Sequence, residues 1–168
     1  FGTINQTSEP EIHFGADDNA SGTAGMLEIG RYLSSSTLTK NNYVLIAFSG
    51  EEKGLLGSTY FLTTSNFKKF VPNYMINLDM IGRFPDDKSI FEVWGTASSP
   101  VWDSLLNNNP PDFAKLKQIR GVIEDSDYEP FYKKKMPVLF FFTGLHKDYH
   151  SPRDIKEKVN YPGEVKII

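Results

Sequence analysis

Residues 43–52 read YVLIAFSGEE and combine a continuous apolar run with two adjacent carboxylates. An apolar run of this kind, bounded by Asn41-Asn42 and Ser49-Gly50, is typical of a strand that is buried on both faces of a sheet. We therefore predict a strand over residues 43–48. Residues 138–142 read VLFFF and predict a second buried strand.

The rest of the chain alternates short strands with helices. Further strands are predicted over residues 74–78, 90–94 and 118–123. The spacing of apolar residues predicts helices over 19–33, 55–62 and 101–106, with helical turns over 130–135 and from residue 163 onward. This alternation predicts an α/β fold around a mostly parallel central sheet. No internal repeat or linker divides the chain.

Composition excludes several classes of protein. The chain has 168 residues, with 18 Lys and Arg against 21 Asp and Glu, so its formal net charge is −3. No basic tract supports a nucleic-acid partner, and no apolar run is long enough to span a membrane. The absence of cysteine excludes a disulfide scaffold, a thiolate zinc site and a cysteine nucleophile. Thirteen Phe, eight Tyr and two Trp provide material for a hydrophobic core.

Polar side chains cluster where the predicted strands end. Because ligands of open α/β sheets bind beyond the carboxyl ends of the strands, these side chains are expected to meet at one edge. Carboxylates and imidazoles suit zinc and related divalent ions, and a carboxylate that is not a ligand can move the proton of a water. Four segments supply them: Asp17-Asp18, Glu51-Glu52, Asp79, and the group His146, Asp148, Tyr149 and His150.

Four motifs resemble those of the co-catalytic zinc aminopeptidases of clan MH. This branch includes secreted bacterial aminopeptidases, glutamate carboxypeptidase-like proteins and glutaminyl cyclases. The resemblance implies a three-layer α/β/α sandwich of the zinc-exopeptidase kind, a peptide substrate, a two-zinc site and an exported protein. The motifs are GADDNASG (15–22), FSGEEKGLLGS (48–58), NLDMIGR (77–83) and GLHKDYHSPRD (144–154).

The resemblance also implies a role for each matching residue. Asp18 matches the carboxylate that bridges the two metals, and Glu51 matches the general base. Glu52 and His150 match ligands of one zinc, and Asp79 matches a ligand of the other. Tyr149 matches a tyrosine that in some members hydrogen-bonds the tetrahedral intermediate.

The chain departs from the family pattern in one respect that affects the metals. The family's second zinc also takes a histidine from an upstream His-x-Asp motif, whereas the histidines here are His13, His146 and His150. We therefore interpret residues 1–168 as part of a catalytic domain that is incomplete at both ends. Such a fragment is expected to hold at most one zinc well and to be impaired or inactive. In addition, Asp127-Tyr128 stands where relatives often show Asp-His.

Other interpretations stay open. Asp17 is expected to be a turn or cap residue, and His13 and His146 are expected to be bystanders. The same residues would suit a single-zinc acyltransferase similar to glutaminyl cyclase, or a non-catalytic domain on a peptidase fold. The expected partner is a peptide substrate, with no nucleic acid and no membrane span. Self-association through an exposed part of the sheet is a further expectation.

Overall fold

The sheet is organised around β4 (Val138–Phe141), which lies between two neighbouring strands in the order β1-β4-β2-β3. The computed structural model describes residues 11–70, 72–85, 90–122 and 126–168. β4 pairs in parallel with β1 (Met75–Leu78) and antiparallel with β2 (Ile90–Trp94). β2 pairs in parallel with β3 (Lys115–Ile119). Two of the three pairings are parallel, so the predicted α/β fold with a mostly parallel sheet is confirmed.

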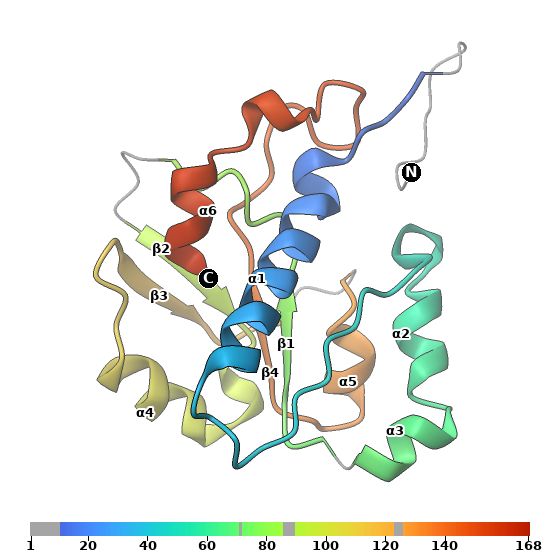
Figure 1. Ribbon diagram of the computed structural model, residues 1–168, viewed down its shortest axis with the longest axis vertical. Coiled ribbons are helices and arrows are strands. Elements are labelled where there is room, and N and C mark those ends of the chain that lie inside the picture. The colour runs from blue at the N-terminus through green and yellow to red at the C-terminus, as the bar shows by residue number, and fades with distance from the viewer. Residues whose placement is uncertain (1–10, 71, 86–89, 123–125) are drawn as a thin grey trace.

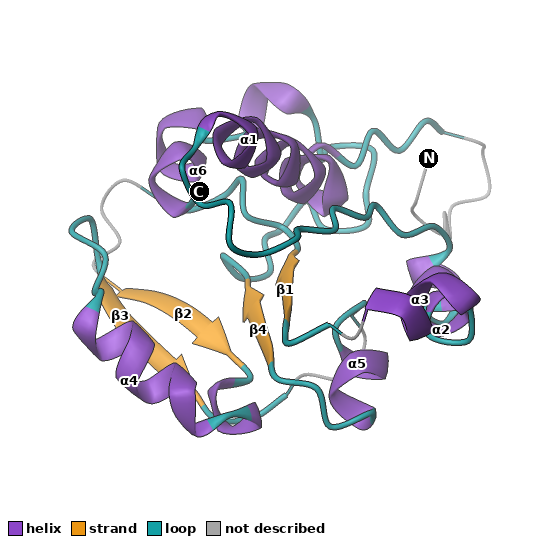
Figure 2. Ribbon diagram, turned by 60° about the horizontal axis from the view of Figure 1, so that its bottom comes forward, coloured by secondary structure: helices purple, strands orange, loops and turns teal. Residues whose placement is uncertain are grey.

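Helices cover both faces of the sheet. Figure 2 shows α1 and α6 above one face, α4 and α5 below the other, and α2 and α3 beside the β1 edge. Ser99 caps α4 by accepting a hydrogen bond from the Val101 N–H, and Asn160 caps α6 in the same way through Gly163. The helices are α1 (Gly22–Ser35), α2 (Leu56–Phe61), α3 (Ser65–Phe70), α4 (Pro100–Asn108), α5 (Glu129–Lys133) and α6 (Tyr161–Ile167).

Two hydrophobic clusters meet at β4. Val138 and Phe140 join one cluster, while Leu139 joins the other. The ring of the fully buried Tyr128 stacks on Phe140 with 4.8 Å between the centroids. On the other side, Trp102 of α4 is buried in the cluster of Leu139. Because β4 packs on both faces, each of its positions is apolar.

The predicted strand over residues 43–48 is wrong. These residues form no strand, and the side chains of Tyr43, Val44 and Leu45 are 40%, 50% and 46% exposed. β1 is an edge strand whose other side pairs with none of the described strands, and residues 43–48 do not add to it there. Only the last residue of this segment, Phe48, packs against the cluster around Phe140.

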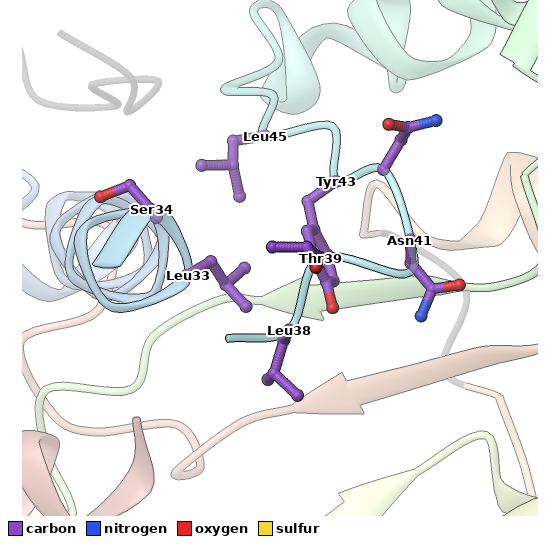
Figure 3. A pocket seen from close by; sticks show the side chains of 9 residues that line it. Leu33, Ser34, Leu38, Thr39, Asn41, Tyr43 and Leu45 are labelled. Carbon is purple, nitrogen blue, oxygen red and sulfur yellow. The ribbon is translucent and has the colours of Figure 1, made fainter. Parts of the chain in front are cut away.

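Part of this segment instead borders a pocket at the end of α1. The pocket has a volume of about 350 Å³, and Figure 3 shows Leu33 of α1 on one side with Tyr43 and Leu45 on the other. The expectation of self-association concerns the sheet itself and stays a prediction.

The other predicted elements differ from the structure mainly at their ends. β3 covers residues 115–119, whereas the prediction was 118–123, and residue 123 lies outside the described part of the chain. The register with β2 fixes these bounds, because Ile90 pairs with Lys115 and Trp94 with Ile119. The helix predicted over 19–33 begins at Gly22, after the helical turn η1 (Ala16–Ser21), which carries Asp17 and Asp18.

Candidate metal centre

Three of the predicted site residues come together at the edge of the sheet. The Nε2 atom of His150 lies 3.2 Å from Asp18 Oδ2 and 3.0 Å from Glu52 Oε1. One ligand atom from each residue lies within 4.8 Å of the other two. Asp18 belongs to η1, Glu52 to the 3-10 turn η2 (Glu51–Lys53), and His150 to the loop that follows β4. Segments far apart in the sequence therefore supply one nitrogen and two oxygen ligands.

The parallel pairing of β1 and β4 explains why these segments meet. Both strands end at the same side of the sheet, close to the start of α1 (Figure 1). The side chain of Asn19 donates a hydrogen bond to the Leu78 carbonyl at 3.0 Å, which holds η1 against the end of β1. The turn that carries Glu52 is bounded by Gly50 and Gly54, with φ angles of 70° and 94° that favour glycine.

Two non-glycine residues at this edge have left-handed backbone conformations. His150 has φ 51°, and Met80, which directly follows Asp79, has φ 52°. Such conformations cost on the order of 1–3 kcal/mol each and are concentrated at functional sites. The chain therefore accepts backbone strain at the two places where predicted ligands follow β1 and β4.

The carboxyl groups in this region hold protons more tightly than usual. Burial raises the pKa of Asp18 to about 7, with further contributions from the charges of Asp79 and Glu52. Burial also raises the pKa of Glu51 to about 8, again with help from Asp79 and Glu52. Burial likewise raises the pKa of Asp79, to about 6. Several acids thus share a site that lacks a compensating cation among the described side chains.

The geometry of the three converging residues fits a divalent cation. Asp18 Oδ2 is buried and makes no hydrogen bond with the described residues. His150 Nε2 faces two carboxylate oxygens, yet a ring nitrogen carries at most one proton. A cation between these atoms would satisfy all of them, and zinc accepts this mixture of imidazole and carboxylate ligands.

Asp79 lies beside this group and is held in its own hydrogen-bond chain. Ser126 Oγ donates to Asp79 Oδ2 at 2.8 Å, and Asn77 Nδ2 donates to Ser126 Oγ at 2.7 Å. Asp79 is not one of the three residues whose ligand atoms converge. Its charge nevertheless raises the pKa of Asp18, so the two carboxyls interact.

Glu51 and Tyr149 border the three converging residues without joining them. Glu51 shares the turn η2 with Glu52 and is partly buried. The ring of Tyr149 stacks on that of His150 with 3.7 Å between the centroids, and its side chain is 38% exposed. Burial and the surrounding acids raise the pKa of Tyr149 to about 12, so its hydroxyl keeps its proton at neutral pH.

A buried hydrogen-bond network that the sequence does not reveal lies behind these residues. Asp17 is fully buried, and its Oδ1 accepts hydrogen bonds from the Gly82 N–H at 2.7 Å and from Ser21 Oγ at 3.0 Å. The Asp148 N–H donates to Nδ1 of His146, which leaves Nε2 as the donor that lies 3.1 Å from Asp17 Oδ2. Asp17 lies in the turn η1, as expected, and tertiary contacts also engage its side chain and that of His146. The expectation that His146 takes no part in the reaction stays a prediction.

Tyr128 belongs to the core and not to the metal group. Its side chain is fully buried, and its ring stacks on that of Phe140. No helix within the described ranges combines the length and the apolar composition that a membrane span requires.

Comparison with known proteins gives one family. The sequence matches the pattern of Peptidase family M28 over residues 3–167. It is 33% identical to Aminopeptidase YwaD of Bacillus subtilis, over 87% of this chain and 34% of that protein. It is 31% identical to Leucine aminopeptidase 2 of Trichophyton equinum, over 84% of this chain and 30% of that protein. The chain thus spans about a third of the length of these relatives.

Solved structures show the same architecture. BSAP, a zinc aminopeptidase from Bacillus subtilis, superposes with a TM-score of 0.72 at 27% identity, covering 95% of this chain and 41% of that one. The LapA aminopeptidase of Legionella pneumophila gives a TM-score of 0.76 at 18% identity, covering 95% and 45%. A Bacteroides thetaiotaomicron glutaminyl cyclase gives 0.65 at 17% identity, covering 98% and 64%. The last two likenesses concern the fold alone.

Proposed function

Because the chain belongs to peptidase family M28, we propose that it carries the metal centre of a zinc-dependent aminopeptidase, which removes N-terminal residues from peptides. The observation that carries this proposal is the convergence of Asp18, Glu52 and His150. The single proton of the imidazole Nε2 cannot hydrogen-bond fully to both facing carboxylates, whereas a cation can bind all three side chains. Because this chain spans only about a third of the length of the relatives compared above, the activity is proposed for the whole protein of which the chain is a part. We also propose that this protein is exported, as the resemblance implies.

In this proposal Asp18, Glu52 and His150 would hold one zinc ion. A second ion would share Asp18 and take Asp79, which makes only two carboxylate ligands among the described residues. Three protein ligands are usual for a catalytic zinc, so we propose that this chain holds one ion well. Bound zinc would polarise the scissile carbonyl and lower the pKa of a water molecule.

Glu51 is proposed to move the proton. It is adjacent to Glu52 in η2 but is not among the three converging residues, so its carboxylate stays available to a water molecule. The carboxylate takes a proton from the attacking water and returns it to the nitrogen of the leaving amine, which regenerates the base. In the metal-free chain, burial together with the surrounding acids raises the pKa of Glu51 to about 8. A cation held by the neighbouring ligands would offset the charge of those acids and favour the carboxylate form of Glu51 that accepts the proton.

Tyr149 is proposed to stabilise the oxyanion of the tetrahedral intermediate. Its hydroxyl is protonated at neutral pH and can donate a hydrogen bond to a developing negative charge. Stacking against His150 fixes the position of its ring relative to the ligand.

The test is hydrolysis of aminoacyl anilides by the full-length protein, with and without zinc. We expect activity that needs zinc, that disappears in Glu51→Gln, and that persists in Glu92→Gln. Glu92 of β2 is a suitable control because it forms an ion pair with Lys117 of β3, outside the metal group. Formation of pyroglutamate without anilide hydrolysis would instead support the acyltransferase alternative, and inactivity toward both substrates would support a non-catalytic domain.

A further inference from the structure

A buried carboxylate lies directly behind the proposed ligands. Asp154 follows His150 by four residues and is 2% exposed. Its Oδ2 atom accepts hydrogen bonds from the backbone N–H groups of Asp17 at 2.9 Å and Asp18 at 3.0 Å. Its Oδ1 atom pairs with Arg83 at 2.9 Å. Hydrogen bonds to an ionised acceptor are roughly twice as strong as neutral ones, so Asp154 restrains the backbone of Asp18 firmly.

These contacts join the three segments that carry Asp18, Asp79 and His150. Asp18 lies in η1, Arg83 follows Asp79 in the segment after β1, and Asp154 lies in the loop after β4 that carries His150. A backbone hydrogen bond from the Ala16 N–H to the Asp154 carbonyl, at 3.1 Å, reinforces the link to η1.

The loop between His150 and Asp154 is itself held by local hydrogen bonds. The Ser151 N–H donates to the Asp148 carbonyl, and the Asp154 N–H donates to the Ser151 carbonyl, both at 3.1 Å. These bonds limit the movement of Asp154 relative to His150. Because the Asp154 side chain accepts a hydrogen bond from the Asp18 backbone, it also sets the distance between Asp18 and His150.

We propose that Asp154, with Arg83 as its charge partner, is the positioning residue that orients Asp18 toward Glu52 and His150. This inference rests on the proposed function, because it assigns Asp154 a role in zinc binding. Asp154 does not touch the metal group with its own carboxylate. It acts through the hydrogen bonds that it accepts from the backbone N–H groups of Asp17 and Asp18.

The substitution Asp154→Asn probes this role with little change in shape. An amide offers one oxygen and one NH₂ group, whereas the native carboxylate accepts on both of its oxygens. The NH₂ group must therefore face either Arg83 or the two backbone N–H groups, and donors oppose each other in both cases. Loss of a residue that orients a ligand typically weakens metal affinity roughly 10–100-fold. We expect a loss in this range for zinc.

A second substitution should reverse part of that loss. In the double variant Asp154→Asn with Arg83→Gln, the glutamine oxygen can accept from the asparagine NH₂ group, and the asparagine oxygen again accepts from Asp17 and Asp18. We expect the double variant to bind zinc more tightly than Asp154→Asn alone. Independent structural defects would instead add, and the double variant would be worse than either single variant.

Asp148 provides a matched control. It is also 2% exposed, lies in the same loop, and its carboxylate pairs with Lys158 at 2.9 Å and with Arg83 at 3.6 Å. No hydrogen bond from its side chain to the Asp18 backbone is present in the described structure. We expect Asp148→Asn to lower thermal stability but to leave zinc affinity within about threefold of wild type.

The experiment measures zinc affinity by competition with a chelator, together with amide hydrogen exchange at Asp17 and Asp18 in the metal-free protein. The expected result is weakened zinc binding and faster exchange at both amides in Asp154→Asn, with neither change in Asp148→Asn. If wild type binds zinc and Asp154→Asn binds it equally tightly, the positioning role is overturned while the proposed function stands. If wild type binds no zinc, the proposed function fails and this role fails with it.

Folding of the variant does not decide the outcome alone. If Asp154→Asn does not fold, the double variant becomes the test, because it removes the opposed donors. A folded double variant with zinc affinity closer to wild type supports the proposal. A double variant that also fails to fold or to bind zinc overturns it.

Discussion

The substitution Glu51→Gln should stabilise the metal-free protein in a pH-dependent way. In the folded chain the pKa of Glu51 is about 8, against an ordinary value of 4.5. The folded state therefore binds more protons than the unfolded state between these values, and stability falls as the pH rises through this window. Below about pH 4.5 the group is protonated in both states and has no effect. Glutamine is neutral throughout and avoids the loss.

The size of the effect follows from the same pKa difference. A difference of 8 − 4.5 = 3.5 would correspond to about 5 kcal/mol at about 1.4 kcal/mol for each pH unit. Because Glu51 is only partly buried, solvent screening reduces this to on the order of 2 kcal/mol. For a chain of 168 residues, such a gain raises the melting temperature by roughly 4–8 °C.

The assay is thermal unfolding in the presence of a chelator at pH values from 5 to 8. Glu51→Gln should be close to wild type near pH 5 and exceed it by nearly the full amount at pH 8. Glu92→Gln, on the exposed ion pair with Lys117, should follow wild type at every pH. A Glu51→Gln variant that is no more stable than wild type at pH 8 would refute the reasoning, because it would mean that the acids around Glu51 do not destabilise its charged form.

The remaining predictions concern turnover and the core. In the full-length protein, Glu51→Gln should abolish turnover while elemental analysis still finds the zinc content of wild type, and loss of zinc in this variant would make Glu51 a ligand. Tyr149→Phe should lower kcat roughly 100-fold with little change in KM if its hydroxyl stabilises the oxyanion, and an unchanged kcat would remove it from the mechanism. Phe140→Ala should cost about 3–5 kcal/mol in denaturant unfolding, because it empties the contact with Tyr128, and a cost below about 1 kcal/mol would contradict its place in the core.

The sequence predicted the elements whose apolar runs are satisfied by neighbouring strands. Residues 138–141 form β4 because strands lie on both sides and side chains pack on both faces. Residues 43–48 have a similar pattern but form no strand, and they pair with none of the described strands. Hydrophobicity indicates that a segment can be buried, whereas strand formation depends on hydrogen-bond partners that periodicity does not reveal.

The same distinction applies to the metal group. Placement after the predicted strands, together with the resemblance, singled out Asp18, Glu52 and His150, which the structure brings together. Asp154 and Arg83 were not singled out, although both lie inside the quoted motifs. Their importance comes from hydrogen bonds to backbone groups far away in the sequence, and such bonds leave no signal in composition or spacing.

The most direct test of the central claim is the zinc content of the purified 168-residue chain after dialysis, measured with wild type and His150→Ala side by side. Asp18, Glu52 and His150 form a single converging group among the described residues, so we expect one tightly held zinc ion per chain in wild type. Removing the imidazole leaves two carboxylates and should release that ion. Two tightly held ions, none, or equal zinc content in wild type and His150→Ala would contradict the account.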